Sequence, residues 1–90
     1  MKKIVYPGTF DPITNGHIDL LERASRLFDQ IILAVATSKR KQPLFVIDER
    51  VQLAKDATKH LENVIVRQLD CLLVNFVRDC SADGVLRGLR

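Results

Sequence analysis

The sequence predicts a protein of the α/β class, built on an open parallel sheet with helices on both faces. Three observations favour this class. Short apolar runs, rich in β-branched residues, alternate with segments whose apolar residues recur at helical spacing. Residues 31–36 form an apolar run without polar alternation, which is typical of a strand covered on both faces. The chain of 90 residues is long enough for one domain, which we expect to span residues 1–90.

The first half of the chain contains two predicted strands that flank a helix. The first strand covers residues 4–6, and we expect it to end at Pro7 and Gly8, because these residues cannot continue a central strand. After a loop rich in Gly, Pro, Thr and Asn, a helix is predicted over residues 18–28, and residues 31–36 follow as the second strand. The apolar residues of this helix are Ile18, Leu21, Ala24, Leu27 and Phe28.

The second half of the chain continues the alternation of helices and strands. Both cysteines, Cys71 and Cys80, fall in one predicted helix, where roughly 13 Å along the helix axis would separate them. We therefore expect no disulfide between them. The predicted segments are residues 51–61 (helix), 64–66 (strand), 71–80 (helix) and 85–86 (strand).

The resulting pattern βαβαβαβ restricts the topology. Crossovers between parallel strands are almost always right-handed, and 90 residues are too few to close an eight-stranded barrel. We therefore expect a Rossmann-like open parallel sheet with helices on both faces. No helix follows the last predicted strand, so we expect the C-terminal part of the domain to lie beyond Arg90.

The composition excludes several classes of protein. The 14 Lys and Arg residues exceed the 11 Asp and Glu residues by only three, and no aromatic residues lie between the basic ones, so we expect no nucleic-acid partner. The longest apolar run is too short for a membrane helix, and the N-terminus lacks the pattern of a secretory signal. We therefore expect a cytoplasmic protein without a membrane partner. Basic clusters at residues 39–41 and 87–90 favour small phosphorylated ligands.

Residues 6–17, which join the first strand to the first helix, carry the clearest chemical pattern. Gly8 has no side chain, so a phosphate could approach its backbone closely. Thr9 offers both a hydroxyl group and an amide donor to such a phosphate. These two residues predict that the turn after the first strand contacts a phosphorylated ligand.

The start of the first helix supplies the second part of the pattern. Either Asn15 or Thr14 can cap the helix, which places Gly16 and His17 in its first turn. Backbone N–H groups and the helix dipole favour an anion at that position. The imidazole of His17 would donate a hydrogen bond to charge that develops on a phosphoryl oxygen, so we predict that it stabilises a transition state.

The combined segment resembles a known signature. Gly-Thr-Phe-Asp-Pro at residues 8–12 precedes Thr-Asn-Gly-His at residues 14–17, and this combination favours a functional site over a tight connection with a surface histidine. It resembles the (H/T)xGH signature of the nucleotidyltransferase superfamily. The form with Thr14 is similar to the bacterial phosphopantetheine adenylyltransferases. The resemblance extends along all 90 residues and includes the ending Arg-Gly-Leu-Arg at residues 87–90.

This resemblance implies an activity and its partners. In that family, ATP and 4′-phosphopantetheine react to give dephospho-coenzyme A and pyrophosphate, a step of coenzyme A biosynthesis that Mg²⁺ assists. It also implies a homohexamer. The residues that it assigns to ATP are Thr9, Phe10, His17, Gly88, Leu89 and Arg90, with His17 holding the reacting phosphate. The remaining ATP-binding elements of the family would lie beyond residue 90.

The resemblance assigns a second group of residues to 4′-phosphopantetheine. Lys41 and Arg87 would bind its phosphate, Leu73 would lie against its pantetheine arm, and Thr9 would contact both substrates. Counting back from Pro43 selects Lys41 within the basic cluster at residues 39–41. No metal ligands are assigned.

The sheet topology predicts where these residues meet. If the fourth strand lies beside the first, with the second and third on the other side, the strand order reverses there, and ligands bind beyond the carboxyl ends of strands at such a point. His17 and Arg87 would then face one crevice. Two alternatives remain open. The chain could transfer cytidylyl groups or adenylate nicotinamide mononucleotide, against which Thr14 and the Arg-Gly-Leu-Arg ending argue, or it could be a noncatalytic nucleotide-binding fragment.

Overall fold

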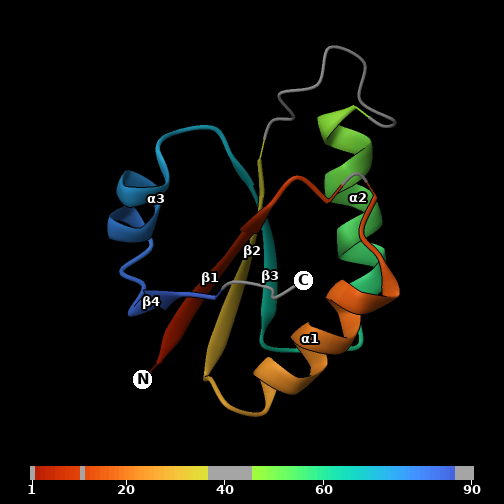
Figure 1. Cartoon of the computed structure of the whole chain (residues 1–90), viewed down its shortest axis with the longest axis horizontal. Coiled ribbons are helices and arrows are strands. Elements are labelled where there is room, and N and C mark those ends of the chain that lie inside the picture. Colours follow the sequence, from red (N-terminus) through yellow and green to blue (C-terminus); the bar gives the residue numbers. More distant parts are fainter. Residues whose placement is uncertain (1, 11, 37–45, 87–90) are drawn as a thin grey trace.

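The computed structural model describes residues 2–10, 12–36 and 46–86, and it has the expected α/β architecture. Strands and helices alternate in the predicted order along these residues (Figure 1). The elements are β1 (Lys3–Gly8), α1 (Asn15–Ser25), β2 (Gln30–Ala36), α2 (Ile47–Thr58), β3 (Val64–Leu69), α3 (Leu73–Asp79) and β4 (Gly84–Val85).

The four strands form one parallel sheet in the order β3-β2-β1-β4 (Figure 1). Ile4 of β1 pairs with Ile31 of β2 on one side and with Gly84 of β4 on the other. The chain order thus reverses at β1, as predicted. Because all strands are parallel, their carboxyl ends lie along one edge of the sheet, from which the loops that follow β1 and β2 depart.

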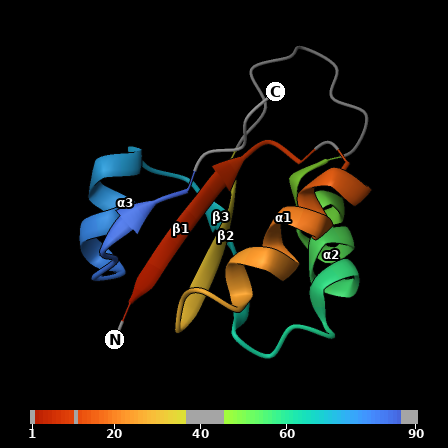
Figure 2. The same cartoon turned by 60° about the horizontal axis from the view of Figure 1, so that its bottom comes forward.

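Helices cover both faces of the sheet, as expected (Figure 2). Helices α1 and α2 pack on one face, here called the α1–α2 face, and α3 packs on the other, the α3 face. Strand β2 is buried at residues 31–35 without interruption, which confirms the prediction of a strand covered on both sides. The hydrophobic core of the α1–α2 face consists of Tyr6, Phe10, Leu21, Ala24, Ile31, Leu33, Val35, Ala54 and Val66, and that of the α3 face consists of Val5, Ile32, Ala34 and Phe76.

Strand β1 is longer than predicted, because Pro7 and Gly8 continue its pairing with β2. The Val5 carbonyl accepts a hydrogen bond from the backbone N–H of Leu86, so Val5 turns its polar groups toward β4. Hydrogen-bonding direction alternates along a strand, and Pro7 therefore faces the same way. Its missing N–H lies on the β4 side, where it removes no bond from the ladder with β2.

Several other boundaries differ from the predictions. Helix α1 ends at Ser25 with Arg26 as its C-cap, so the chain leaves the helical pattern before Leu27, whose side chain is 76% exposed. Helix α2 begins earlier than predicted, at Ile47. Strand β3 continues to Leu69 because it pairs with β2 residue by residue. Strand β4 contains residues 84 and 85 instead of 85 and 86.

The two cysteines do not share a helix, contrary to the prediction. Leu72 has the extended backbone angles of an N-cap residue, so α3 begins at Leu73 and Cys71 lies before it. Cys80 is the C-cap of the same helix. Both cysteines are free thiols.

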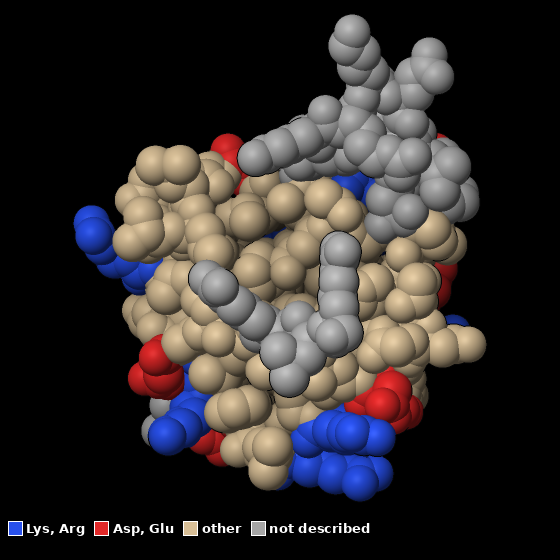
Figure 3. Space-filling view, in the orientation of Figure 1, with Lys and Arg blue, Asp and Glu red and all other residues tan. Residues whose placement is uncertain are grey.

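The charged residues are dispersed over the surface that Figure 3 shows. Lys and Arg side chains lie in separate groups near the rim of this face, interspersed with Asp and Glu, and uncharged residues fill much of its centre (Figure 3). Within the described ranges, no helix is both long enough and apolar enough to cross a membrane.

Candidate functional site

The turn after β1, residues 8–10 and here called the site turn, lies at the carboxyl edge of the sheet. Phe10 has a φ of 46°, in the left-handed region that non-glycine residues rarely adopt. Its ring is only 3% exposed and lies over Gly8, where an added Cβ would come within 2.9 Å of the Phe10 Cζ atom. Gly8 therefore accommodates the Phe10 ring, and the approach of a phosphate to its backbone stays a prediction.

Thr14 caps helix α1, which decides between the two capping residues that the sequence allowed. The Thr14 hydroxyl oxygen accepts a hydrogen bond from the His17 backbone N–H at 3.4 Å. In return, the Thr14 backbone N–H donates to Nδ1 of His17 at 2.9 Å, and the Thr14 hydroxyl lies 3.0 Å from the same nitrogen. This reciprocal capping box is the structural reason for the Thr-x-Gly-His spacing.

The capping box also sets the protonation of His17. Because Nδ1 accepts the Thr14 hydrogen bond, the ring proton of the neutral imidazole resides on Nε2. Partial burial lowers the pKa of His17 below its usual value of 6.5, which keeps the ring neutral at pH 7. His17 thus presents a fixed N–H donor at the start of α1.

Aromatic packing fixes the plane of the His17 ring. The Phe10 ring lies edge to face against it, with centroids 4.8 Å apart, and the Tyr6 ring is 6.4 Å away in a similar arrangement. Tyr6 and Phe10 also contact each other edge to face. The structure therefore brings Phe10 and His17 together, as the predictions required. The predicted contact between Phe10 and a nucleotide stays a prediction. Because the Phe10 ring is buried, its main-chain atoms would make that contact.

Gly16 keeps the space at the helix start open. An added Cβ at Gly16 would find its nearest described neighbour, the Thr14 hydroxyl oxygen, at 3.7 Å, which is an ordinary contact. Packing among the described residues therefore does not require a glycine there. The first turn of α1 holds no acidic residue, so its N–H groups and dipole favour an anion.

Arg50 is a residue of this region that the sequence analysis missed. Its side chain is 2% exposed, and its guanidinium donates to the carbonyl oxygens of Thr9 at 2.7 Å and Ala36 at 2.8 Å. The helical spacing of the sequence could have revealed it. The buried stripe of α2 recurs every four residues, at Arg50, Ala54 and Thr58, so the first position of this stripe is a charged residue in the core.

Of the remaining predicted site residues, the structure describes only Leu73. Leu73 lies at the start of α3 and packs against the buried cluster of the α3 face, on the other side of the sheet from α1. Lys41, Arg87, Gly88, Leu89 and Arg90 fall outside the described residues. The meeting of His17 and Arg87 in one crevice thus stays a prediction, although β4 does lie beside β1 and leads to the same edge of the sheet.

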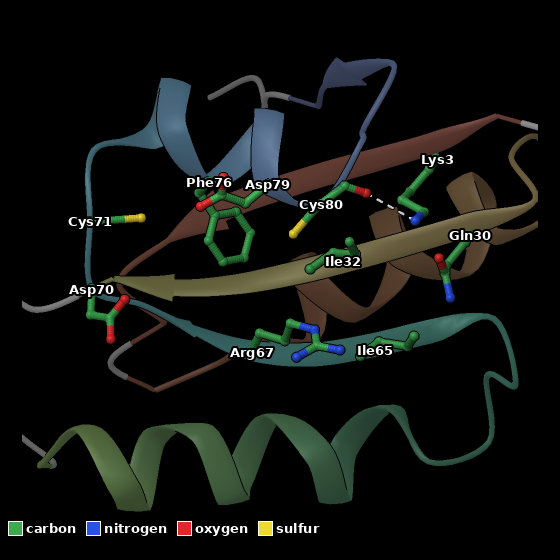
Figure 4. Close-up of a pocket in the computed structure, with 10 residues that line it drawn as sticks. All are labelled: Lys3, Gln30, Ile32, Ile65, Arg67, Asp70, Cys71, Phe76, Asp79 and Cys80. Atoms are coloured by element: carbon green, nitrogen blue, oxygen red, sulfur yellow. Dashed lines mark hydrogen bonds between the residues drawn. The ribbon is translucent and has the colours of Figure 1, made fainter.

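The α3 face has a hollow of about 610 Å³ that contains none of the predicted site residues (Figure 4). Ile32 and Ile65 form its apolar floor, and Phe76 of α3 closes one side (Figure 4). Lys3 at its margin donates from Nζ to the carbonyl oxygen of Cys80 at 2.9 Å. The other lining residues are Gln30, Arg67, Asp70, Cys71 and Asp79.

Among residues 2–10, 12–36 and 46–86, no three His, Cys, Asp or Glu side chains come together in a way that could hold a metal ion. The expectation that Mg²⁺ assists the reaction stays a prediction.

Comparisons with known proteins place this geometry in context. The family model of cytidylyltransferase-like proteins matches residues 5–90. The fold is also similar to the crystal structure of the lipopolysaccharide core biosynthesis protein from Thermoplasma volcanium GSS1, with a TM-score of 0.73 and 23% sequence identity. That match covers 94% of this chain and 72% of the other chain. At this identity the likeness shows a shared Rossmann-like fold.

Proposed function

We propose that this chain, which belongs to the cytidylyltransferase-like family of nucleotidyltransferases, transfers the adenylyl group of ATP to 4′-phosphopantetheine. The products would be dephospho-coenzyme A and pyrophosphate. The observation that carries the proposal is the neutral imidazole of His17, held by Thr14 with its Nε2–H available at the start of α1. Family membership supports nucleotidyl transfer, and the resemblance carried by Thr14 and the ending Arg-Gly-Leu-Arg supports this acceptor.

The reaction is an in-line displacement at the α-phosphorus of ATP. A bond forms between this phosphorus and a phosphate oxygen of the acceptor, while the bond to the departing pyrophosphate breaks. The acceptor phosphate is already an anion at neutral pH, so the protein need not supply a strong base, and no covalent enzyme intermediate is required. The contribution of the protein is positioning and charge stabilisation.

His17 acts in this scheme as a fixed donor. Its Nε2–H donates to an oxygen on the α-phosphorus, where negative charge builds up in the transition state. The proton stays on Nε2 throughout, because the imidazole already carries it in the neutral form that Thr14 selects. The N–H groups of the first turn of α1 bind the same phosphate region.

The other assignments belong to the proposal and come from the resemblance. Thr9 contacts both substrates, Lys41 and Arg87 bind the acceptor phosphate, and Leu73 lies against the pantetheine arm. Mg²⁺ enters with the phosphates of ATP, a common way for this ion to bind. Because the described residues hold no cluster for it, no step is assigned to a protein-bound ion.

A second candidate is cytidylyl transfer, which the cytidylyltransferase-like family match favours. One experiment decides between the two. The chain is mixed with Mg²⁺ and either ATP or CTP, together with 4′-phosphopantetheine, nicotinamide mononucleotide or a phosphorylated alcohol, and release of pyrophosphate is measured. Release with ATP and 4′-phosphopantetheine alone supports the proposal. Release only with CTP selects cytidylyl transfer, and binding of nucleotide without release from any pair overturns both transferase activities for this chain.

The role of His17 has a matched control, because the chain has two histidines. His17→Ala is expected to lower turnover by about a hundredfold or more, the usual loss for one preorganised donor, with a smaller effect on substrate affinity. His60→Ala removes an exposed histidine that pairs with Glu22, and it is expected to leave turnover unchanged. Equal turnover in the two variants would refute the role of His17.

A further inference from the structure

Arg50 is a charged side chain in a position that normally holds an apolar one. It lies in the first turn of α2 and is among the largest fully buried side chains of the described chain. Burial of a guanidinium is costly unless hydrogen bonds replace the lost water. Its Nη1 nitrogen donates two short hydrogen bonds, to the Thr9 carbonyl at 2.7 Å and to the Ala36 carbonyl at 2.8 Å. An apolar side chain would fill this core position of α2 without needing hydrogen bonds to the Thr9 and Ala36 carbonyls.

The two carbonyls that Arg50 binds lie at equivalent points of the sheet. Thr9 directly follows β1, and Ala36 is the last residue of β2. One guanidinium of α2 therefore ties the carboxyl ends of two neighbouring strands, at the edge where the proposed substrates bind. These bonds to backbone oxygens fix main-chain geometry.

The bond to Thr9 acts on the strained residue of the site turn. The Thr9 carbonyl belongs to the peptide unit that joins Thr9 to Phe10, so Arg50 fixes the plane from which the chain enters the left-handed φ of Phe10. Such a conformation is unfavourable for a residue other than glycine and persists only where the surroundings hold it. The Phe10 ring then extends back over Gly8 and against His17.

We infer that Arg50 is a positioning residue for the His17 site: it holds the Thr9 carbonyl, this fixes the site turn, and the Phe10 ring thereby sets the orientation of the His17 imidazole. The inference rests on the proposed function only in giving His17 a catalytic role. The chain of contacts from Arg50 to His17 stands independently of which substrate the protein uses.

The test compares three variants of α2. Arg50→Met removes the donors and keeps an extended side chain, whereas Arg50→Lys keeps the charge but replaces the rigidly directed N–H groups of Nη1 by a rotating ammonium on a shorter, flexible stem. Thr58→Val is the matched control, because Thr58 is equally buried in the same helix and its hydroxyl donates only to Ala54 within that helix. All three are expected to lose stability, so stability alone does not distinguish them.

The distinguishing measurement is the tautomer of His17, read from its two ring nitrogens by ¹⁵N NMR at a temperature where each variant is folded. In the parent chain and in Thr58→Val, the proton is expected on Nε2. In Arg50→Met, and in part in Arg50→Lys, the expected result is a mixture of tautomers and a change in the shifts of the ring protons. If Arg50→Met does not fold, Arg50→Lys carries the test. Unchanged His17 signals in a folded Arg50 variant would overturn the inference.

Kinetics give a second measurement for the active chain. With the substrate pair found above, Arg50→Lys is expected to lower kcat between about tenfold and a hundredfold, the scale of a misplaced catalytic group, with little change in KM. Thr58→Val is expected to retain parental kcat. An equal fall of kcat in both variants would overturn the positioning role. If the parent chain shows no transfer at all, the proposed function fails, and the NMR experiment still decides the role of Arg50.

Discussion

The two faces of the sheet differ in how completely they are packed. On the α1–α2 face, two helices and the site turn enclose a cluster of nine buried hydrophobic residues of the described chain, whereas the cluster on the α3 face has four. The α3 face also has the hollow above Ile32 and Ile65. The proposed catalytic elements stand on the better packed side, because Phe10 is part of that core and His17 packs against it.

This difference shows how the protein can hold an unfavourable turn. The left-handed φ of Phe10 needs surroundings that determine it, and these are a core ring contact, the space over Gly8 and the bond from Arg50. All three lie on the α1–α2 face. On the α3 side, the left-handed φ of 56° falls at Ser81, an exposed residue directly after the C-cap of α3, and not at a core residue.

The largest expected effect comes from truncating a buried residue on the better packed face. Leu33 and Ile32 are adjacent in β2 and face opposite sides, with exposed fractions of 0% and 3%. Leu33→Ala is expected to lower the free energy of unfolding by about 3–5 kcal/mol. Ile32→Ala is expected to lower it by about 2–3 kcal/mol, because Ile32 borders an open hollow and its removal leaves a less enclosed cavity. Urea unfolding of both variants measures the difference. A larger loss for Ile32→Ala would break the comparison between the faces.

A smaller effect is expected at Gly8, where the site turn and the core meet. Gly8→Ala places a Cβ 2.9 Å from the Phe10 ring, so the ring must move, at a cost of about 1–3 kcal/mol. Gly16→Ala is the control, because the one described atom that its Cβ would meet is the Thr14 hydroxyl oxygen at 3.7 Å, and alanine favours a helix. We therefore expect Gly16→Ala to be neutral or stabilising in the same unfolding experiment. Equal losses would show that the Phe10 contact is not the cause.

The pH dependence of stability tests the burial of His17. Its pKa is lowered in the folded state, so folding favours the neutral ring, and this stabilisation is complete above pH 6.5. It is lost as the pH falls through 6.5 toward the folded-state pKa, because the unfolded chain then binds more protons. The urea midpoint of the parent chain should therefore fall more between pH 7.5 and 5 than that of His17→Gln. His60→Gln, measured in parallel, accounts for the His60 pair with Glu22.

The smallest effect is expected on the exposed surface of α1. Asp19 and Arg23 form an ion pair at 3.3 Å, one helical turn apart, with side chains 60% and 75% exposed. Asp19→Asn is expected to cost about 0.3–0.5 kcal/mol or less, and the difference should vanish in high salt. A loss approaching that of Gly8→Ala would mean that surface charges matter as much as the site turn.

Much of the fold followed from patterns in the sequence. The unbroken apolar run of β2 correctly indicated burial on both faces, and the alternation of elements correctly predicted an open parallel sheet. The observed strand order is the one that the sequence analysis had stated as the condition for a shared crevice. Predictions from residue type and spacing alone were wrong where contacts with other strands or the end of a helix decide the conformation. Pro7 stays in a central strand because its missing N–H points away from β2, and Leu27 is exposed because α1 ends just before it.

In the candidate site, too, part of the arrangement followed from the sequence and part required the structure. The spacing of Thr14 and His17 predicted the helix start, and the structure adds the reciprocal bonds that fix the imidazole. The role of Gly8 could not be read from its local sequence, because the Phe10 ring that fills its space comes from a left-handed turn. Arg50 was missed for a similar reason, since its partners lie 14 and 41 residues away along the chain.

The position of β1 has a consequence for how the chain reaches its native state. Strand β1 lies between β2 and β4, and the Lys3 backbone N–H donates to the Asp83 carboxylate, 80 residues away in the sequence. Closing so long a loop costs entropy that only late contacts can offset. During synthesis, the edge of β1 that pairs with β4 therefore stays open until β4 has emerged, and chaperones or other chains can reach it in that interval.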